Sequence, residues 1–484
     1  MHRMSGQDAS FLYTETPTVL MHTLKVQIFA THYKIADYKV LRDRLRATLD
    51  VVPMLRQRVM FVPLNLHHPV LVDDPEFDLD SHIYRAALPE PGGMKELDDM
   101  VSQIMCHRLD RSRPMWELWL LTRLEGGKVA VVHKIHHCLA DGAATVRYLS
   151  RVFEQQAHLE NPGSAADSWQ PEPLPSGRRL MWDALRDHIK VDIRSLPAFL
   201  GLLWQSGKRL VAFHRSVGSP TFERMAHPPP RTRLNHALSA RRSFTTRQLP
   251  LAEAKAIAHA LGGTVNDVVL ALSATAIRDY LLAHHDLPAD PLCTAIPVSA
   301  DAPGSTRESG NQTTYLPTCL WTNIPDPRKR FYAIQRATKL GKQELDLMGR
   351  TTFVQLMHFL PPLFSLWKTN LKQRRRKPER ENYHPMTNVI ISNVTGPAEK
   401  ISGNYGSLED LYSMGPLVEG CGVNITVWSY AGTLNFSLMG CKKAVPDIDL
   451  LADGLLHAKE ELQALGTRHP REPENDAIAA GISQ

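Results

Sequence analysis

Two proline-rich clusters divide this chain of 484 residues into two long parts, and the division limits the folds that are open to it. The clusters, at 171–175 and 228–230, flank a basic segment of helical pattern that contains the apolar run 196–204. Proline interrupts helices and strands, and the chain is longer than one ordinary domain of about 100–200 residues. The sequence therefore predicts a first lobe over residues 1–160, a helical linker over 161–235, a second lobe over 236–466 and a polar tail over 467–484.

The first part alternates between the period of a strand and the period of a helix. Leu24, Val26 and Ile28 alternate with polar residues, which is typical of a half-buried strand. Asp37 stands where it can cap a helix over 38–52. Further along, the pattern predicts a strand over 55–62, a helix over 94–106 and a hairpin made of strands 116–124 and 128–135.

The second part has the same mixed character. Its pattern predicts strands near 242–249, 292–298, 312–321 and 387–394, a hairpin of 422–430 with 433–438, helices over 251–261, 265–283 and 447–465, and two helices within 326–367. Strands mixed with helices in both parts predict an α/β protein, with a mixed sheet flanked by helices in each of two lobes.

Composition and charge exclude several classes of protein. Apolar residues make up 43% of the chain and charged residues 22%, as in soluble globular domains. The net charge is +6, because 56 Lys and Arg stand against 50 Asp and Glu, and so small an excess does not favour a nucleic-acid partner. The six cysteines show no C-x-x-C spacing, the N-terminus has no signal-peptide pattern, and no run of about 18 apolar residues occurs. We therefore expect reduced thiols, a cytoplasmic location and no membrane-spanning helix.

The segment from 131 to 142 holds the residues that are best suited to chemistry. Its pattern predicts a strand that ends at His136 and His137 and is followed by Asp141 and Gly142. Alternation along a strand points the two histidines in opposite directions. A histidine at a strand end can project into a cleft, and Asp141 could orient its ring or hold the turn through an ion pair with an arginine. Gly142 is expected to permit a tight turn.

Three explanations of the histidine pair are open on the residues alone. The rings could be satisfied within a core, they could bind a metal, or one of them could act as a general base in acyl transfer. A metal site needs ligands that converge on one point, and no H-E-x-x-H or comparable pattern completes one. No metal is therefore predicted.

Residues 136–142, His-His-Cys-Leu-Ala-Asp-Gly, resemble the H-H-x-x-x-D-G motif of the bacterial wax ester synthase/acyl-CoA:diacylglycerol acyltransferase family. Further matches follow in the family's order: 114–117 resembles its P-L-W-E block, Asn266-Asp267 its N-D block, and 392–397 its S-N-V-P-G-P block. Met115 replaces a leucine and Thr395 a proline, and the segments 8–11 and 21–22 also resemble the family. The likeness covers roughly residues 5–465, and it implies the two-lobed, chloramphenicol-acetyltransferase-like fold of CoA-dependent acyltransferases.

The resemblance implies a role for each matched residue. His137 would be the general base that takes the hydroxyl proton of the acceptor, while His136 shapes the strand end and Asp141 and Gly142 support the turn. Asn266 would donate a hydrogen bond to the oxyanion of the tetrahedral intermediate or clamp the two lobes, although asparagine is also ordinary at a helix start. Substrate contacts are expected from the other matched residues, with core packing as the alternative for the tryptophan: Pro114, Trp116, Asp267, Ser392 and Asn393.

The resemblance also implies the reaction. A long-chain acyl group would move directly from acyl-CoA to a fatty alcohol, giving a wax ester, or to diacylglycerol, giving triacylglycerol, with no cofactor. Two other functions stay open: acyl transfer from a carrier protein, as in condensation-like enzymes, and a non-catalytic role on lipid-droplet surfaces. No feature of the sequence predicts the chain length, the main product or the oligomeric state.

An apolar segment followed by a basic one indicates contact with a lipid surface. Residues 356–367 are largely apolar, and the stretch from 368 to 380 contains seven lysines and arginines. Such a pair of segments can lie in a bilayer interface, so we expect peripheral membrane or lipid-droplet association through 356–380. A core helix before a solvated loop, or basic residues that meet CoA phosphates, would also fit this pattern.

Overall fold

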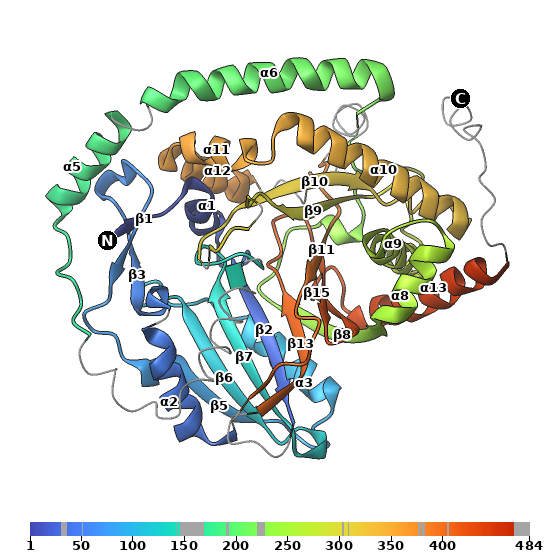
Figure 1. Ribbon diagram of the computed structural model, residues 1–484, viewed down its shortest axis with the longest axis horizontal. Helices are drawn as coiled ribbons and strands as arrows, with labels where there is room; N and C mark the ends of the chain where they lie inside the picture. Colours follow the sequence, from blue (N-terminus) through green and yellow to red (C-terminus); the bar gives the residue numbers. More distant parts are fainter. Residues whose placement is uncertain are drawn as a thin grey trace.

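The computed structural model describes residues 1–30, 36–50, 52–142, 144–145, 169–189, 193–219, 228–302, 304–307, 309–375, 379, 383–403 and 406–468. Within these residues the chain forms two six-stranded mixed sheets, with helices packed against them, and a small three-stranded sheet near the N-terminus (Figure 1). The α/β class predicted from the sequence is therefore confirmed.

The first part of the chain builds most of one large sheet and the whole small sheet. Its elements are β1 His2–Arg3, α1 Gly6–Thr14, β2 His22–Phe29, α2 Tyr38–Leu49, β3 Gln57–Met60, β4 Val70–Asp73, β5 Ile83–Ala87, α3 Met94–Met105, β6 Trp116–Thr122 and β7 Val129–His136. The predicted hairpin is confirmed as β6 and β7, and Asp37 caps α2 by accepting the backbone N–H of Lys39. The strand predicted over 55–62 is shorter, since a 3-10 turn occupies 53–56 before β3.

The large first sheet takes two of its strands from the far end of the chain. These strands are β12 Ser402–Gly403 and β13 Gly406–Met414, and the sheet order is β12-β13-β2-β7-β6-β5. β13 pairs antiparallel with β2, with Met414 opposite Leu24, so β2 has no open edge. The predicted range of the second lobe, 236–466, thus includes residues that belong to the sheet of the first.

Because β13 joins the first sheet, the environment of β2 differs from the one that its sequence predicts. The alternation of its residues predicts a half-buried strand, but all eight residues from His22 to Phe29 are buried. One face packs with α3, and the other lies among residues of α1 and of the strand that carries Trp428. The expectation of a solvated face was therefore wrong, because a face that looks polar in sequence is covered by distant parts of the chain.

The second large sheet has the order β10-β9-β11-β14-β15-β8, and β11 is parallel to both of its neighbours. The elements of this part are β8 Arg242–Pro250, α8 Leu251–Ala260, α9 Val265–Ala283, β9 Cys293–Ser299, β10 Thr313–Cys319, α10 Pro327–Met348, α11 Thr352–Phe359, α12 Pro362–Arg375, β11 Val389–Thr395, β14 Val423–Tyr430, β15 Thr433–Cys441 and α13 Ile448–Arg468. Two helices were predicted within 326–367, whereas α10, α11 and α12 occupy 327–375. Gly349 ends α10 with a φ of 85°, a conformation that favours glycine, and two prolines at 361–362 separate α11 from α12.

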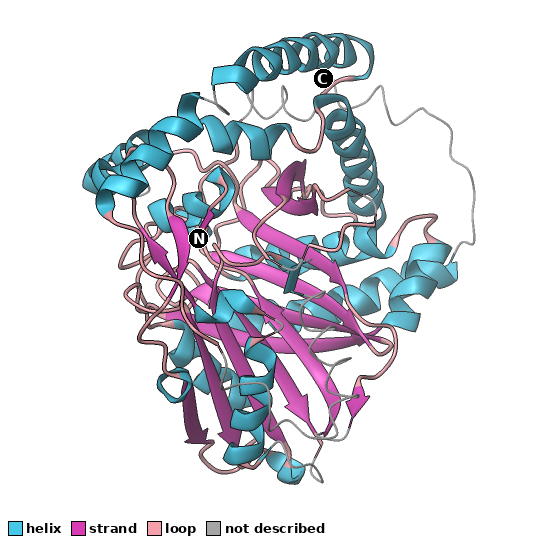
Figure 2. Ribbon diagram, turned by 60° about the vertical axis from the view of Figure 1, so that its left-hand side comes forward, coloured by secondary structure: helices cyan, strands magenta, loops and turns pink. Residues whose placement is uncertain are grey.

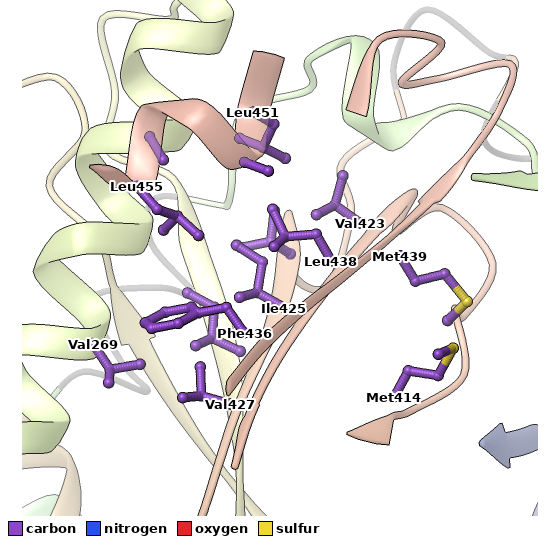
Figure 3. Close-up of a cluster of buried hydrophobic side chains, with 14 of the residues drawn as sticks. Val269, Met414, Val423, Ile425, Val427, Phe436, Leu438, Met439, Leu451 and Leu455 are labelled. Atoms are coloured by element: carbon purple, nitrogen blue, oxygen red, sulfur yellow. The ribbon is translucent and has the colours of Figure 1, made fainter. Parts of the chain in front are cut away.

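Helices α9 and α13 bury one face of the second sheet. Val269 of α9 and Leu455 of α13 pack against Ile425 of β14 and Phe436 of β15, and all of them are almost fully buried (Figure 3). Met414 of β13 belongs to the same cluster, so the hydrophobic core is continuous between the two sheets. Among the described residues no single helix is long and apolar enough to cross a membrane, although α8 and α9, bent by 96°, pass that test as a pair.

The predicted linker contains two helices, α5 Gly177–Asp187 and α6 Ile193–Val217. The long helix α6 runs along the outside of the molecule, over α11 and α10 (Figures 1 and 2). Phe199 stacks on Phe359 at a centroid distance of 4.7 Å, and Ser206 Oγ donates to the backbone oxygen of Met348 at 3.1 Å. The predicted tail beyond residue 468 and parts of the predicted linker lie outside the described residues, and the described end of the linker contains a 3-10 turn at Arg233–Asn235.

Candidate active site

Backbone hydrogen bonds from both neighbouring strands hold the two histidines at the end of β7. The N–H of His136 donates to the oxygen of Met115, just before β6, at 3.0 Å, and the N–H of His137 donates to the oxygen of Met21, just before β2, at 2.8 Å. β6 and β2 lie on opposite sides of β7, so the end of the strand is anchored on both edges. The predicted position of the histidines at a strand end is therefore observed.

The contacts that hold His137 come from residues that are far from it in the sequence. Its ring stacks on Phe11 of α1, with centroids 4.2 Å apart and planes inclined by 12°. Its Nδ1 is buried, and its backbone oxygen accepts a hydrogen bond from Asn311 Nδ2 at 2.7 Å. The residue as a whole remains partly exposed.

His137 is neutral at physiological pH. Burial lowers its pKa to about 4, and contact with its own backbone and the charge of Asp141 act in the opposite direction without reversing the shift. A neutral imidazole has one nitrogen without a proton. With the proton on the buried Nδ1, Nε2 is the nitrogen that can accept a proton from an acceptor hydroxyl.

His136 faces a buried carboxylate rather than a substrate path. Its side chain is fully buried, its Nδ1 accepts the N–H of Cys138 at 3.2 Å, and its Nε2 lies 3.6 Å from Glu15 Oε1. Glu15 is in turn bound by Arg108 at 3.0 Å and by Arg111. These contacts agree with the prediction that His136 shapes the strand end.

Asp141 is bound on both carboxylate oxygens. Oδ1 accepts the N–H of Ala144 at 2.8 Å, which is an N-cap interaction, and Oδ2 accepts Arg307 Nη2 at 2.8 Å and the N–H of Gln312 at 2.9 Å. The predicted arginine partner is therefore Arg307, from the segment before β10. These bonds hold the loop after β7 against the segment before β10. None of them involves the ring of His137.

Gly142 does not have the conformation that was expected for it. Its φ lies outside the left-handed range, and a Cβ there would meet Val394 Cγ2 of β11 at 3.5 Å, an ordinary contact. The prediction that glycine is needed for a tight turn was therefore wrong. The glycine instead leaves space where the motif faces β11.

The two residues of the N-D block, at the start of α9, have different hydrogen-bond partners. Asp267 is buried and forms a capping box, since its Oδ2 accepts the N–H of Thr264 at 2.9 Å and the Thr264 hydroxyl at 2.8 Å. Asn266 is half-buried, and its Oδ1 accepts Asn393 Nδ2 of β11 at 3.4 Å. The contacts of Asp267 are those of a helix cap and do not fit the expected substrate contact.

The residues predicted on β11 lie beside the motif. Gly142 approaches Val394, and alternation along the strand gives Ser392 the same face and Asn393 the opposite face, toward Asn266. The structure thus brings Ser392 to the face nearer the histidine motif and pairs Asn393 with Asn266. The Asn266–Asn393 contact joins two elements of the second lobe and does not bridge the lobes.

Pro114 and Trp116 are core residues at the start of β6. Trp116 is 1% exposed, donates from Nε1 to the backbone oxygen of Leu55 at 2.7 Å, and stacks on His82 at 4.5 Å. Pro114 is buried, and its backbone oxygen accepts the N–H of Trp116 at 3.0 Å. The packing alternative for the tryptophan therefore fits the structure better than direct substrate contact.

Sequence reasoning missed the residues that hold His137 from a distance. Phe11 and Asp8 lie in the segment 8–11, for which the resemblance suggested no role. Asp8 is buried and its Oδ1 accepts Asn311 Nδ2 at 2.7 Å, so Asn311 bonds both to α1 and to the backbone of His137. The family-like segment 8–11 was the available signal for Phe11, whereas no local pattern marks Asn311.

A cavity of about 540 Å³ lies next to the histidine motif. Cys138, Leu139, Arg307, Asn311 and His358 are among the residues that form its wall, together with the N-terminal segment. His137 is not among the described residues that line it.

Two domain models of one known family match most of this chain. Residues 4–269 match the model of the wax ester synthase/diacylglycerol acyltransferase catalytic domain, and residues 309–464 match that of the WS/DGAT C-terminal domain. The chain belongs to the wax ester synthase/diacylglycerol acyltransferase family. The two matched regions include 136–142, Asn266-Asp267 and 392–397, so the resemblance carried by these blocks is confirmed.

Full-length relatives of this acyltransferase family occur in mycobacteria. A Mycobacterium tuberculosis (strain H37Rv) protein, provisionally named a diacylglycerol O-acyltransferase, is 35% identical over 463 residues, which cover 94% of each chain. A second protein of the same strain and the same kind of name is 32% identical over 481 residues, covering 96% of this chain and 97% of the relative.

Solved structures of the wax ester synthase/diacylglycerol acyltransferase family and of related folds agree with the two-lobed architecture. The wax ester synthase/diacylglycerol acyltransferase from Marinobacter aquaeolei VT8 is 27% identical, with a TM-score of 0.63 over 96% of this chain and all of that one. The first condensation domain of the calcium-dependent antibiotic synthetase has a TM-score of 0.60 over 97% of both chains at 15% identity, which shows the fold alone. The predicted fold of two chloramphenicol-acetyltransferase-like lobes is confirmed.

Proposed function

We propose that this enzyme moves a long-chain acyl group from acyl-CoA to the hydroxyl of a fatty alcohol or of diacylglycerol, with His137 as general base. The family is one of acyltransferases, and the names of its relatives state diacylglycerol or wax ester chemistry. The observation that carries the proposal is the neutral imidazole of His137, which is anchored at a strand end in a partly exposed residue with its Nδ1 buried.

In this reaction one imidazole carries the proton from the acceptor hydroxyl to the leaving thiolate. The acceptor hydroxyl gives its proton to Nε2 of His137 while its oxygen bonds to the thioester carbonyl carbon. The carbon–sulfur bond then breaks, and the CoA thiolate takes the same proton from the imidazolium. Cys138 is no competing nucleophile, because burial raises the pKa of its thiol far above the usual range and keeps it protonated.

Asn266 is the proposed donor to the oxyanion. Its Oδ1 is occupied by Asn393 Nδ2 at 3.4 Å, which orients the amide and leaves its two N–H groups free of that contact. An amide donor at the developing negative charge stabilises a transition state by about 3–4 kcal/mol, and for Asn266 this role requires the intermediate to extend past β11, because its partner Asn393 lies on the face of that strand away from the motif. The alternative role as a clamp between lobes has less support, since its partner lies in the same lobe.

The base role is tested with the purified full chain, palmitoyl-CoA as donor, and hexadecanol or diacylglycerol as acceptor. His137→Gln should lower the rate by about 10²–10⁴-fold, because glutamine keeps hydrogen-bonding groups but cannot take up the proton. The matched control is His457→Gln, at an exposed histidine of α13, which should leave the rate unchanged. An unchanged rate in His137→Gln would contradict the proposal.

Two other outcomes of this assay would favour the alternative functions. Ester formed from an acyl-carrier protein but not from acyl-CoA would favour a carrier-dependent enzyme. No ester with any donor, from a folded protein, would favour a non-catalytic role on lipid surfaces.

We also infer that α6 and α12 form a lipid-contact surface, which extends the expectation made for 356–380. Trp204 of α6 is 67% exposed and Trp367 of α12 is 59% exposed, and Leu200, Leu363 and Phe364 are exposed beside them in the sequence. Large apolar side chains left exposed in this number mark a surface that meets an apolar partner. The basic residues Arg376, Lys377 and Arg380 lie outside the described residues.

Charge on the same helices favours an anionic bilayer as that partner. Neither α6 (193–217) nor α12 (362–375) contains an Asp or Glu, while each contains four lysines or arginines. Cations near an anionic lipid surface contribute about 1 kcal/mol each. Insoluble acyl acceptors would also be delivered directly to an enzyme that lies on such a surface.

Vesicle sedimentation tests this surface. The enzyme should bind phosphatidylcholine vesicles that contain phosphatidylglycerol, and Trp204→Ser with Trp367→Ser should weaken binding by about tenfold or more. Leu450→Ser, at an apolar residue of α13 that is 47% exposed, is the control and should bind like the wild type. Equal binding by the tryptophan variant would contradict the assignment of this surface.

A further inference from the structure

Two cysteines of the second sheet lie opposite each other, in a part of the molecule that the proposed reaction does not use. Cys293 is the first residue of β9 and Cys319 is the last of β10, and the two strands are antiparallel neighbours at the edge of the sheet (Figure 1). The register makes the cysteines direct partners, although they are 26 positions apart in the sequence. Their sulfur atoms are 3.3 Å apart, which is van der Waals contact.

The hydrogen bonds around Cys293 explain why the two side chains meet. In an antiparallel pair of strands, hydrogen-bonded and non-hydrogen-bonded pairs of residues alternate, and the Cα atoms of the latter are only about 4.5 Å apart. The N–H of Leu320 donates to the oxygen of Leu292 at 2.7 Å, so that neighbouring pair is hydrogen-bonded. The backbone of Cys293 faces the other way, since its N–H donates to Asn388 Oδ1 at 2.8 Å and its oxygen accepts the N–H of Asn388 at 2.9 Å. Cys293 and Cys319 therefore form a non-hydrogen-bonded pair.

This geometry fits a disulfide bond without a shift of either strand. A disulfide joins residues whose Cα atoms lie about 4.4–6.8 Å apart, and a non-hydrogen-bonded pair falls within that range. The bond itself measures about 2.0 Å, so the two sulfurs must approach by about 1.3 Å from 3.3 Å. Rotation about the Cα–Cβ bonds of the two side chains is enough for such a movement.

The two thiols differ in their access to solvent. Cys319 is half-buried, whereas Cys293 is 3% exposed. A partly exposed cysteine beside a second one is the arrangement of redox-sensitive pairs, in which the first sulfur meets the oxidant and the second resolves the product. Of the other four cysteines, three are buried, and the half-buried Cys106 donates from Sγ to the backbone oxygen of Ser102 at 3.1 Å.

We propose that Cys293 and Cys319 are a modification site, at which a hydroperoxide converts the pair to a disulfide that fastens β10 to β9. Hydrogen peroxide first oxidises the thiol of Cys319 to a sulfenic acid, and the second oxygen of the peroxide leaves as water. The sulfur of Cys293 then bonds to the sulfur of Cys319, the sulfur–oxygen bond breaks, and the hydroxyl leaves as water with the proton of the Cys293 thiol. Two thiols are thus oxidised, and one peroxide is reduced to two molecules of water.

The bond would act on the strand that supports the histidine motif. Within the described residues, β10 is an edge strand whose one strand partner is β9. Just before β10, the N–H of Gln312 donates to Asp141 Oδ2 at 2.9 Å and Asn311 Nδ2 donates to the backbone oxygen of His137 at 2.7 Å. A disulfide closes a loop and removes conformational freedom from the unfolded chain, so it should delay the loss of this support on heating.

Peptide mapping of the purified full chain tests the modification. After a short exposure to a small molar excess of hydrogen peroxide, the remaining thiols are blocked at low pH and the protein is digested. The wild type should give the peptides of Cys293 and Cys319 joined, with the loss of two hydrogen atoms, and dithiothreitol should separate them. Cys319→Ser should give no such product, whereas Cys106→Ser, at the other half-buried cysteine, should give it as the wild type does.

The same treatment of the wild type unfolded in urea shows whether the fold selects the pair. In the unfolded chain the six cysteines meet in many combinations, so the Cys293–Cys319 product should be a minor one among mixed pairs. This comparison needs no variant, so it decides the question even where Cys319→Ser does not fold. Equal selectivity in the unfolded chain would overturn the proposal, as would a folded chain that oxidises Cys319 to a sulfinic acid without the link or forms no link at all.

Thermal unfolding measures whether the bond fastens the sheet. The oxidised wild type should unfold at a temperature about 2–5 °C above that of the reduced protein, and dithiothreitol should abolish the difference. Cys319→Ser should show no such rise after peroxide, whereas Cys106→Ser should show it. A linked protein that unfolds at the same temperature as the reduced one would overturn the fastening role of the bond.

Discussion

Arg307 and Asp141 form an ion pair between residues 166 positions apart, with Nη2 2.8 Å from Oδ2. Asp141 follows β7 of the first sheet, and Arg307 precedes β10 of the second. The backbone of Gln312 donates to the same oxygen at 2.9 Å, so the motif is tied to the second lobe at its acidic residue. The site is thus assembled at a junction of the lobes, and its geometry depends on how they are joined.

Removing the arginine should destabilise the protein and disturb the motif. Arg307→Met leaves the buried Asp141 carboxylate without its cation, at a cost of about 3 kcal/mol in the free energy of unfolding, measured by urea denaturation. The exposed pair of Lys95 and Asp99 is the control, and Lys95→Met should leave the free energy of unfolding nearly unchanged, because solvent screens an exposed pair. Similar costs for the two variants would show that the Asp141 pair contributes no more than a surface pair.

The two residues of the N-D block should respond differently to substitution. Asn266→Ala should lower kcat by about 10²–10³-fold with little change in stability, because it removes the proposed oxyanion donor. Asp267→Ala should cost about 1 kcal/mol in the free energy of unfolding through the lost cap with Thr264, while kcat changes little. Steady-state kinetics and thermal unfolding of both variants check the contrast, and the reverse assignment of effects would refute it.

The close approach of α1 to α11 should make Gly6 intolerant of a side chain. A Cβ at Gly6 would lie 2.1 Å from the backbone oxygen of Met357, so Gly6→Ala forces the helices apart. We expect a loss of about 1–3 kcal/mol in the free energy of unfolding, and weaker activity because α1 also holds the ring of His137 through Phe11. Gly201→Ala is the control: nothing lies within 4 Å of a Cβ there, and alanine favours the helix α6.

Stability should fall when the solution is acidified below about pH 6.5. Burial lowers the pKa of His133 to about 4, and the charge of Lys25 adds to the shift, whereas an unfolded histidine titrates near ~6.5. Between these values the unfolded chain binds a proton that the folded protein does not, so the free energy of unfolding decreases as the pH decreases, by up to about 3 kcal/mol for this residue.

Urea denaturation at several pH values between 4 and 7 measures this dependence. His133→Gln should flatten it by the slope of one proton, about 1.4 kcal/mol per pH unit. His457→Gln, at the exposed histidine of α13, serves as control and should keep the wild-type slope. An unchanged slope in His133→Gln would mean that other groups cause the acid sensitivity.

Elements with local signals were predicted well. The hairpin β6–β7 follows from alternation on both sides of a glycine turn, and the cap Asp37 acts on a backbone group two residues away. Strand β13 at 406–414 was not predicted, because its pairing with β2 depends on residues almost four hundred positions apart, such as Met414 and Leu24.

The site was predicted in part for the same reason. His136, His137 and Asp141 lie close together in the sequence, at the end of one strand and in the loop after it, so their placement follows from β7 alone. Gly142 and Asp267 were assigned roles by their position in a motif, and the contacts of Val394 and Thr264 give them others. Phe11, Asn311 and Arg307 could not be assigned, because each reaches the motif only after the chain has folded.

Local order in the chain thus determined the α/β elements, the strand that ends in two histidines, and the family to which these blocks point. The tertiary structure alone decided that Arg307 neutralises Asp141, that Phe11 stacks on His137, and that Lys25 is buried instead of solvated. The reason is physical: alternation and capping act between neighbours in sequence, whereas burial, charge pairing and ring stacking depend on distances that only the packing of two lobes creates.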